Sequence, residues 1–360
     1  MSRPIGRSRI AELLLAALLA IAATACSGAA ESAAPRSSSA PPTSSGAAPS
    51  TSAAQVSPSP TATPTSSSPK TSASPSASGS APAAAKNTCS SPGACGFPDA
   101  KTTGHRTKLV ARDTGYMAVR QDGLVIRGWD ITGSLDIYAN NVTVIDSRIT
   151  SDNWWGINLR PGYSGLKVLH TTITAVPGKG PDNGGVDYAV SNMGGSSIEV
   201  GWCDVSVFGD ALSMGQGNIH DNYVHDIVPF VNLGKEWQHT NAVISGGGNT
   251  GHLVIRHNTL LNPTSLKQGA SGSIGLFADT GVVRNVTVDD NWIAGGAYAL
   301  YGGSTGATGI KVTDNVFSTQ YHPASGGYGV VAHWNADGAG NVWRNNRMSD
   351  GRLVTPEPAS

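Results

Sequence analysis

The chain has 360 residues, of which 45 are Gly and 21 are Pro, while only 13% are charged and 6% are aromatic. Its 24 basic and 24 acidic residues balance and no Lys/Arg cluster stands out, which argues against nucleic acid as a partner. No sustained helical periodicity occurs, so an intracellular α-helical protein is also an unsuitable interpretation.

Residues 1–25 have the composition of an export signal, because three Arg residues precede an apolar stretch and small residues follow it up to Cys26. This ending resembles a bacterial lipoprotein signal with Cys26 as the acylated residue, although Ala23 stands where Leu is commonest. We expect the acyl chains to hold the exported protein on the extracellular face of the cell membrane. The alternative is ordinary cleavage near Ala25, which leaves Cys26 as an unpaired thiol.

A low-complexity segment occupies residues 26–88. Of the 60 residues from Ser27 to Lys86, 51 are Ser, Ala, Pro or Thr. Such a segment buries too little apolar area to offset its ordering entropy, and its Pro residues stiffen it. We predict a disordered, extended spacer.

The remaining residues form one predicted domain, 89–354, with a short tail, 355–360. From residue 87 onward the chain has 18 basic and 22 acidic residues and all nine His. Cys89 and Cys95 flank a Pro-Gly turn, and export permits disulfides. We expect these two residues to be bridged and Cys203 to be a buried thiol.

Short β-branched runs recur through this domain at intervals of 18 to 36 residues, and each leads to one recurring position. A strand that returns with loops of varying length between is typical of a β-solenoid, here of roughly nine coils. The recurring residues are Trp129, Ser147, Thr171, Cys203, Asn222, Asn258, Asn291, Asn315 and Asn345. Coils stack about 4.8 Å apart, so aligned Asn side chains can bond to one another, and Asn tolerates the left-handed backbone of a tight corner. These residues are therefore structural.

The runs resemble the right-handed parallel β-helix of the pectate-lyase-like superfamily. The motifs GFPDAKTTG, AGGAYALYGG and GNVWRNNRMSDGRLV are similar to those of a group of actinobacterial secreted β-helix proteins. This resemblance implies an all-β, single-stranded right-handed parallel β-helix. It does not imply one activity, because the superfamily holds lyases, hydrolases, transferases and non-catalytic members.

A second strand recurs before each corner, and its first residues are expected to stack along one ridge. Those residues are Trp155, Asp187, Asp210, Asn241, Ile274, Tyr298 and Tyr328. Carboxylates on adjacent coils repel, which raises one pKa and can provide the acid and base of glycosidic cleavage. Alternatively, both carboxylates bind turn amides or a structural Ca²⁺.

Comparison with the resembled superfamily leaves its motifs incomplete. Related chains often carry H-T-D-G, where this chain has Asn241 and Ala242. An amide cannot transfer protons but can bind a sugar hydroxyl. Lyase chemistry needs an Arg or Lys base beside Ca²⁺ ligands, and Arg256 is available, although its direction is undecided.

A polar insertion around the acids carries candidate proton carriers and substrate contacts. His239 is a candidate catalytic proton carrier, while His225 and Glu236 are candidate substrate contacts. A zinc site formed by His220, His225 and His239 matches no tight ligand spacing, so no metal is assigned.

Aromatic residues are expected to line the groove. Trp154 and Trp155 are consecutive in a strand, which should place one in the core and leave the other free to stack on a sugar. Tyr298, Tyr301 and Tyr328 extend this row.

The sequence thus favours a surface-tethered polysaccharide hydrolase or lyase with Asp187, Asp210 and His239 as catalytic residues. The expected substrate contacts are Asn241, His225, Glu236, Trp155, Tyr298 and Tyr328. A polysaccharide or cell-wall glycan is the expected partner, membrane contact is through the lipid only, and Ca²⁺ is a conceivable cofactor. A non-catalytic carbohydrate-binding β-helix and a structural or adhesive envelope protein are the alternatives.

Overall fold

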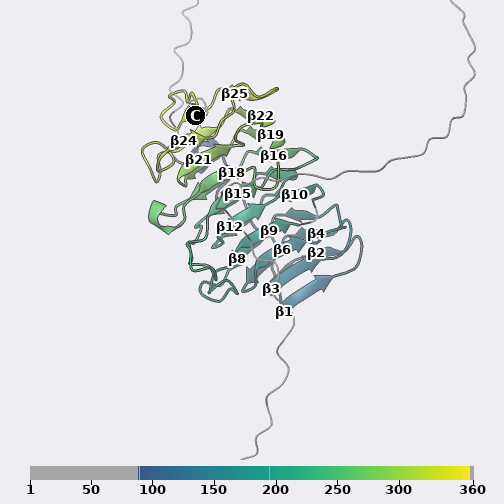
Figure 1. The fold of residues 1–360 in the computed structure, drawn as a ribbon. Helices are drawn as coiled ribbons and strands as arrows, with labels where there is room; N and C mark the ends of the chain where they lie inside the picture. The colour runs from purple at the N-terminus through teal and green to yellow at the C-terminus, as the bar shows by residue number, and fades with distance from the viewer. Residues whose placement is uncertain (1–87, 89, 194, 357–360) are drawn as a thin grey trace, which may run out of the picture. The chain divides into compact units, whose positions relative to one another are not determined.

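Stacked parallel strands make up the described part of the chain. The computed structural model describes residues 88, 90–193 and 195–356, so the predicted signal, Cys26, Cys89 and nearly all of the spacer lie outside it. The strands pair in parallel and form one sheet of nine strands and one of seventeen. The predicted all-β parallel β-helix is confirmed, and Figure 1 shows its coils following one another from β1 (Val110–Val119) to β25 (Val342–Arg344).

Three faces surround the core, and each coil contributes a strand to each face. The nine-stranded sheet, called sheet 1, contains β2 (Val125–Arg127), β4 (Thr143–Ile145), β7 (Lys167–Leu169), β10 (Ile198–Gly201), β13 (Gly217–His220), β16 (Leu253–Arg256), β19 (Arg284–Asp289), β22 (Thr308–Thr313) and β25.

The seventeen-stranded sheet covers the other two faces, because β1 and β3 (Trp129–Ile137) run along both. Sheet 2 follows the corner and contains β5 (Arg148–Ser151), β8 (Thr172–Ala175), β11 (Asp204–Ser206), β14 (Tyr223–His225), β17 (Thr259–Asn262), β20 (Trp292–Gly295), β23 (Val316–Phe317) and β26 (Arg347–Met348). Sheet 3 contains β6 (Trp155–Leu159), β9 (Tyr188–Asn192), β12 (Asp210–Ser213), β15 (Asn241–Ser245), β18 (Gly272–Leu276), β21 (Tyr298–Gly302) and β24 (Gly329–Ala332). Two short 3₁₀ turns, Gly93–Cys95 and Leu266–Gln268, are the helical elements of the described residues, and neither is long enough to cross a membrane.

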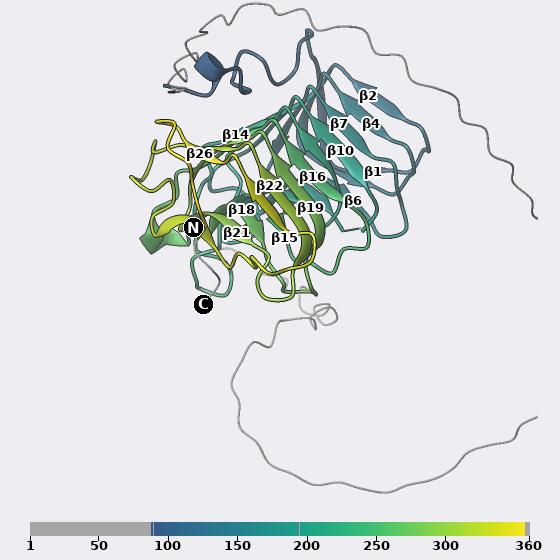
Figure 2. The same cartoon turned by 90° about the horizontal axis from the view of Figure 1, so that it is seen from above.

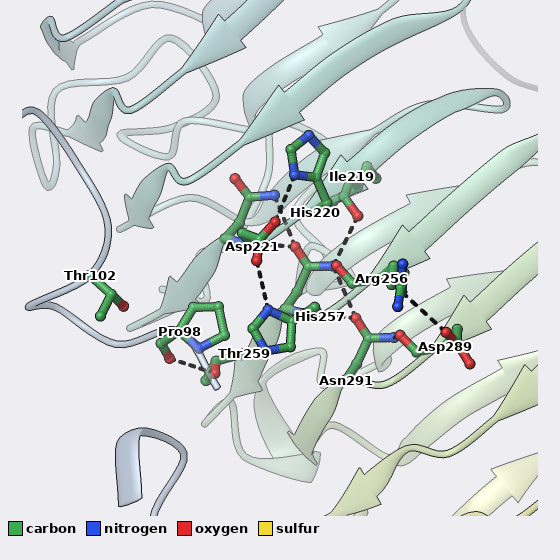
Figure 3. Close-up of polar contacts among 12 residues, drawn as sticks. Pro98, Thr102, Ile219, His220, Asp221, Arg256, His257, Thr259, Asp289 and Asn291 are labelled. Carbon is green, nitrogen blue, oxygen red and sulfur yellow. Dashed lines mark hydrogen bonds and ion pairs between the residues drawn. The ribbon is translucent and has the colours of Figure 1, made fainter. Parts of the chain in front are cut away.

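An Asn ladder joins the coils at the corner between sheets 1 and 2. The backbone N and Nδ2 of Asn258 donate to Oδ1 of Asn291 at 3.0 and 2.9 Å, and Asn291 donates likewise to Asn315 at 2.9 Å for both bonds. These side chains have no exposed area. The predicted alignment of Asn258, Asn291 and Asn315 is confirmed, and Figure 3 shows Asn291 at the end of the bonded row.

Two details of the corner differ from the prediction. Asn315 donates to Oδ1 of Asn346, so the final ladder residue is Asn346 and the prediction of Asn345 was wrong. The left-handed conformation belongs to the residue before each ladder residue, as in His257 (φ 52°) and Asp290 (φ 52°). The ladder Asn is thus selected for its inward amide, and its neighbour supplies the bend.

An N-terminal segment packs beside the stacked coils, as the dark blue trace in Figure 2 shows. The Phe97 ring lies 5.9 Å from that of Trp292, and the Pro98 carbonyl accepts a 2.6 Å bond from the Thr259 hydroxyl. Cys95 in this segment is disulfide-bonded, while Cys203 is a buried free thiol as expected.

Candidate functional site

Sheet 3 brings together most of the predicted site, but in a different register. Tyr188 pairs with both Trp155 and Asp210, which places Asp187 one residue before the row. Asp210 also pairs with Asn241, as predicted.

The C-terminal part of the predicted row was also shifted. Tyr298 pairs with Gly272 and Gly329, so Ile274 and Tyr328 do not belong to this row. The constant spacing used to align the coils failed because the loops before β18 and β24 differ in length.

A cluster of three carboxyl groups nevertheless forms beside this row. Asp182, Asp187 and Asp210 are 6%, 5% and 3% exposed. Burial, together with the charge of Asp182 and a hydrogen bond to it, raises the pKa of Asp187 to about 7. Burial and the charge of Asp187 raise the pKa of Asp210 to about 7, although Asn241 opposes that shift. Two carboxyls can therefore exchange protons near neutral pH.

Asn241 fixes the position of Asp210. Its Nδ2 donates to Asp210 Oδ1 at 2.7 Å, and its Oδ1 accepts from the Gly272 backbone N–H at 2.8 Å. The side chain is fully buried. The prediction that this amide binds a sugar hydroxyl is replaced by a positioning role, because both of its polar atoms already have partners.

The loop 226–240 covers the carboxyl cluster. The Leu233 backbone N–H donates to Asp182 Oδ1 at 2.6 Å, and a Cβ added at Gly185 would lie 2.2 Å from the Phe230 ring. A Cβ at Gly209 would lie 2.9 Å from the same ring. These two glycines let Phe230 lie directly over the backbone beside the acids, so the loop acts as their roof.

A pocket of about 310 Å³ opens next to the cluster. Its lining includes His239, Asn241, Phe277, Asp279 and Tyr301. The predicted proton carrier His239 is exposed and reaches this pocket, and Asn241 links the pocket to Asp210. The pocket thus provides solvent access beside the buried acids.

Aromatic rings continue from the pocket along sheet 3. Tyr301 lies 5.0 Å from Phe277 and 5.6 Å from Tyr298, and Tyr298 lies 5.9 Å from Tyr328. The expected aromatic row is therefore present, with Tyr328 entering it from the loop before β24.

Trp155 lies at the other end of the row. It is half-buried, with the Arg160 guanidinium 5.5 Å above its ring, and Trp154 is 38% exposed. Neither side chain belongs to the core, so the expectation of one core Trp was wrong. Strand β6 begins only at Trp155, and alternation does not extend to Trp154.

Two predicted substrate contacts lie away from the cluster. His225 is on sheet 2, where its Nε2 and Nδ1 lie 2.8 Å from carboxylate oxygens of Asp204 and Asp226. Its predicted pairing with Asp226 is present, and these carboxylates raise the pKa of His225 against the effect of burial. Glu236 is exposed at the tip of the 226–240 loop. Proximity in sequence did not bring either residue to the acids, because the insertion leaves sheet 2 before it reaches sheet 3.

A second polar cluster lies on sheet 1 and its corner, shown in Figure 3. Both oxygens of Asp221 are taken, by Nδ1 of His220 at 2.8 Å and Nδ1 of His257 at 2.6 Å. Arg256 faces outward and pairs with Asp289 at 3.2 Å, so it is not beside the groove acids. The groups of this cluster satisfy one another across coils.

Neither zinc nor Ca²⁺ fits the candidate residues. His220, His225 and His239 lie on sheet 1, on sheet 2 and in the loop before sheet 3. Within the described ranges, no three His, Cys, Asp or Glu side chains are placed to hold a metal ion. Asp187 and Asp182 share a hydrogen bond, which requires a proton where Ca²⁺ would need free carboxylate oxygens.

Asp182 was missed by the sequence reasoning. It lies in a Gly-rich loop, 176–186, that has no counterpart in the other coils. Repeats identify strand residues, and a carboxyl supplied by a single loop leaves no periodic signal.

Fold and site together define a parallel β-helix with a buried carboxyl cluster and an aromatic row on one face. No family model, curated protein or solved structure matches the chain. The arrangement of residues therefore carries the functional argument.

Proposed function

We propose that the protein is a polysaccharide hydrolase that acts through Asp187 and Asp210. The observation that carries this proposal is the pair of neighbouring carboxyls whose pKa values both stand near 7. No Lys, Arg or His of the described residues contributes to either shift. Near neutral pH such a pair holds one proton, which leaves one group as general acid and the other as base or nucleophile.

Loop movement is part of this proposal. Carboxyls with only 3% to 6% exposure cannot touch a polymer while Phe230 and Leu233 lie over them. Opening of the loop 226–240 exposes the acids to a chain lying along sheet 3, and closing excludes water. His239, at the base of this loop, relays protons between the pocket and solvent.

Hydrolysis is preferred to β-elimination because no strong base lies at the groove acids. Arg256, the candidate lyase base, is on sheet 1 with Asp289. The resemblance to the pectate-lyase-like superfamily supports a polysaccharide as substrate. The lipoprotein-like ending at Cys26 supports tethering of the enzyme at the outer cell surface.

Release of reducing ends from a polysaccharide panel tests the proposal. The wild type should cleave a responsive polymer, and Asp187→Asn or Asp210→Asn should each lower the rate by about 10²-fold or more. Asp289→Asn, which removes a carboxylate on sheet 1, is the matched control and should retain the rate. Equal rates in all four proteins would remove the proposed roles of Asp187 and Asp210.

The second candidate is a carbohydrate-binding β-helix without catalysis. Burial of the acids and the two internal bonds of Asn241 favour it. Asn241→Asp distinguishes the two candidates, since a gain of cleavage from an inactive wild type indicates a scaffold whose acid has been replaced. Binding without any such gain supports the binding module.

A further inference from the structure

Large apolar side chains gather on the loops that lead into sheet 3. Among the described residues twelve large hydrophobic side chains are exposed, and five of them stand on the loops before β15, β18 and β24. These five are Val228 (37%), Leu233 (65%), Trp237 (41%), Leu266 (38%) and Tyr328 (66%). Exposed apolar groups gathered in this way mark a binding surface.

The three loops touch one another, so this surface is continuous. A Cβ added at Gly269 would lie 3.2 Å from the Cβ of Trp237. A Cβ added at Gly327, beside Tyr328, would lie 2.7 Å from the nearest methyl of Leu266. Trp237, Leu266 and Tyr328 thus form one rim along the groove.

The rim leads into the aromatic row of the groove. Tyr328 contacts Tyr298, which contacts Tyr301, and the Tyr301 ring is 5.8 Å from His333. A Cβ at Gly275 would lie 2.2 Å from the Phe277 ring, so this glycine makes room for an aromatic surface on the floor of the groove. The row ends at the pocket that Asn241 links to Asp210.

The charges along this path select against anionic sugars. The pocket lining includes Asp279 and no Lys or Arg, and the carboxyl cluster lies behind it. Lys235 and Lys267 stand on the rim loops, away from this lining. On the other half of the groove Arg160 already faces Asp136 at 3.7 Å. A polyuronate would therefore meet its own sign of charge where it approaches the acids.

We propose that Tyr328, Tyr298, Tyr301 and Phe277 form a track that stacks on the sugar rings of a neutral polysaccharide. Pyranose rings with equatorial substituents present flat C–H faces that suit such a track, as in β-linked glucans, mannans and xylans. The track spans the coils of β18, β21 and β24, and at about 4.8 Å per coil it accommodates two to three sugar units. This inference rests on the proposed function and names the substrate class of the same groove.

Calorimetric binding to soluble β-glucan, glucomannan, xylan and polygalacturonate tests the track, using the full chain with Asp210→Asn to stop turnover. We expect binding to at least one neutral polymer and none to polygalacturonate. Tyr328→Ala and Tyr298→Ala should each weaken binding by about tenfold, whereas Tyr328→Phe, which keeps the ring, should bind within about twofold of its parent.

Leu353→Ala is the matched control, because Leu353 is 65% exposed and lies near the C-terminus, away from the track. It should bind like its parent, and thermal unfolding should show that all variants are folded. Binding to polygalacturonate alone, to no neutral polymer, or with equal affinity in Tyr328→Ala and Leu353→Ala would overturn the track. Binding by the wild type without cleavage would instead contradict the proposed hydrolysis while the track stands.

Discussion

At the corner between sheets 1 and 2, neighbouring residues have separate tasks. The first adopts a left-handed backbone, and the second turns its side chain into the ladder. The sequence predicted the ladder because Asn recurs, but "RNNR" offers two adjacent Asn residues. The preceding pairs, Asp290-Asn291 and Asp314-Asn315, place the ladder residue second, and this pattern selects Asn346 over Asn345.

Asn346→Ala should lower the free energy of unfolding by about 2–4 kcal/mol, because Asn315 loses the acceptor for two bonds and Val312 loses a donor. Asn345→Ala should cost only about 1 kcal/mol, since that exposed residue supplies a left-handed backbone and one surface contact. Urea unfolding of both variants measures the difference. A larger loss for Asn345→Ala would contradict the ladder assignment.

The carboxyl cluster predicts a specific pH dependence of stability. Because the folded-state pKa values of Asp187 and Asp210 are raised to about 7, their contribution is complete below about pH 4 and is lost as the pH rises toward 7. Between pH 4 and pH 8 the wild type should lose on the order of 3 kcal/mol more unfolding free energy than Asp187→Asn. Groups with lowered pKa values, such as Asp146 beside Arg106, act oppositely in both proteins and cancel in this comparison. Parallel pH profiles would show that the cluster is not protonated in the folded protein.

At the level of elements, loops determine what the strands can do. The sequence located Asp210, Asn241 and Tyr298 in one row because strand residues repeat. It misplaced His225 and missed Asp182, because the loops that carry or surround them occur once. Loop packing depends on contacts such as Phe230 over Gly185, which no local pattern encodes.

Gly185→Ala should loosen the loop 226–240, because the new methyl would lie 2.2 Å from the Phe230 ring and displace it. We expect faster proteolytic cleavage within the loop and a stability loss of about 1–3 kcal/mol. Gly215→Ala is the control, since its Cβ would meet only Asn249 at 3.5 Å. Equal protection of the loop in both variants would contradict its role as the roof of the acids.

At the level of the whole molecule, the repeats were enough to predict the fold, since each coil restates the same strand and corner pattern. The contacts divide the chain near Ala77, and Ser78–Ser360 is a compact unit. A fragment of residues 78–360 should therefore unfold within about 2 °C of the full chain, as scanning calorimetry would show. A fragment that fails to fold would show that earlier residues are needed for the solenoid.

The expected anchor at Cys26 lies outside the described residues and remains a prediction. Labelled palmitate should enter the wild type and not Cys26→Ala, which should be released into the medium. Equal labelling of the two proteins would remove the anchor.

The central claim is that Asp187 and Asp210 hold a proton near neutral pH and respond to a glycan. Carboxyl ¹³C NMR of Asp-labelled protein, titrated from pH 4 to pH 9 with and without the neutral polymer that binds, measures this directly. We predict two resonances that titrate near pH 7, that are assigned by their loss in Asp187→Asn and Asp210→Asn, and that shift when the polymer is added. Titration of both carboxyls below pH 5, or resonances unchanged by saturating polymer, would contradict the account.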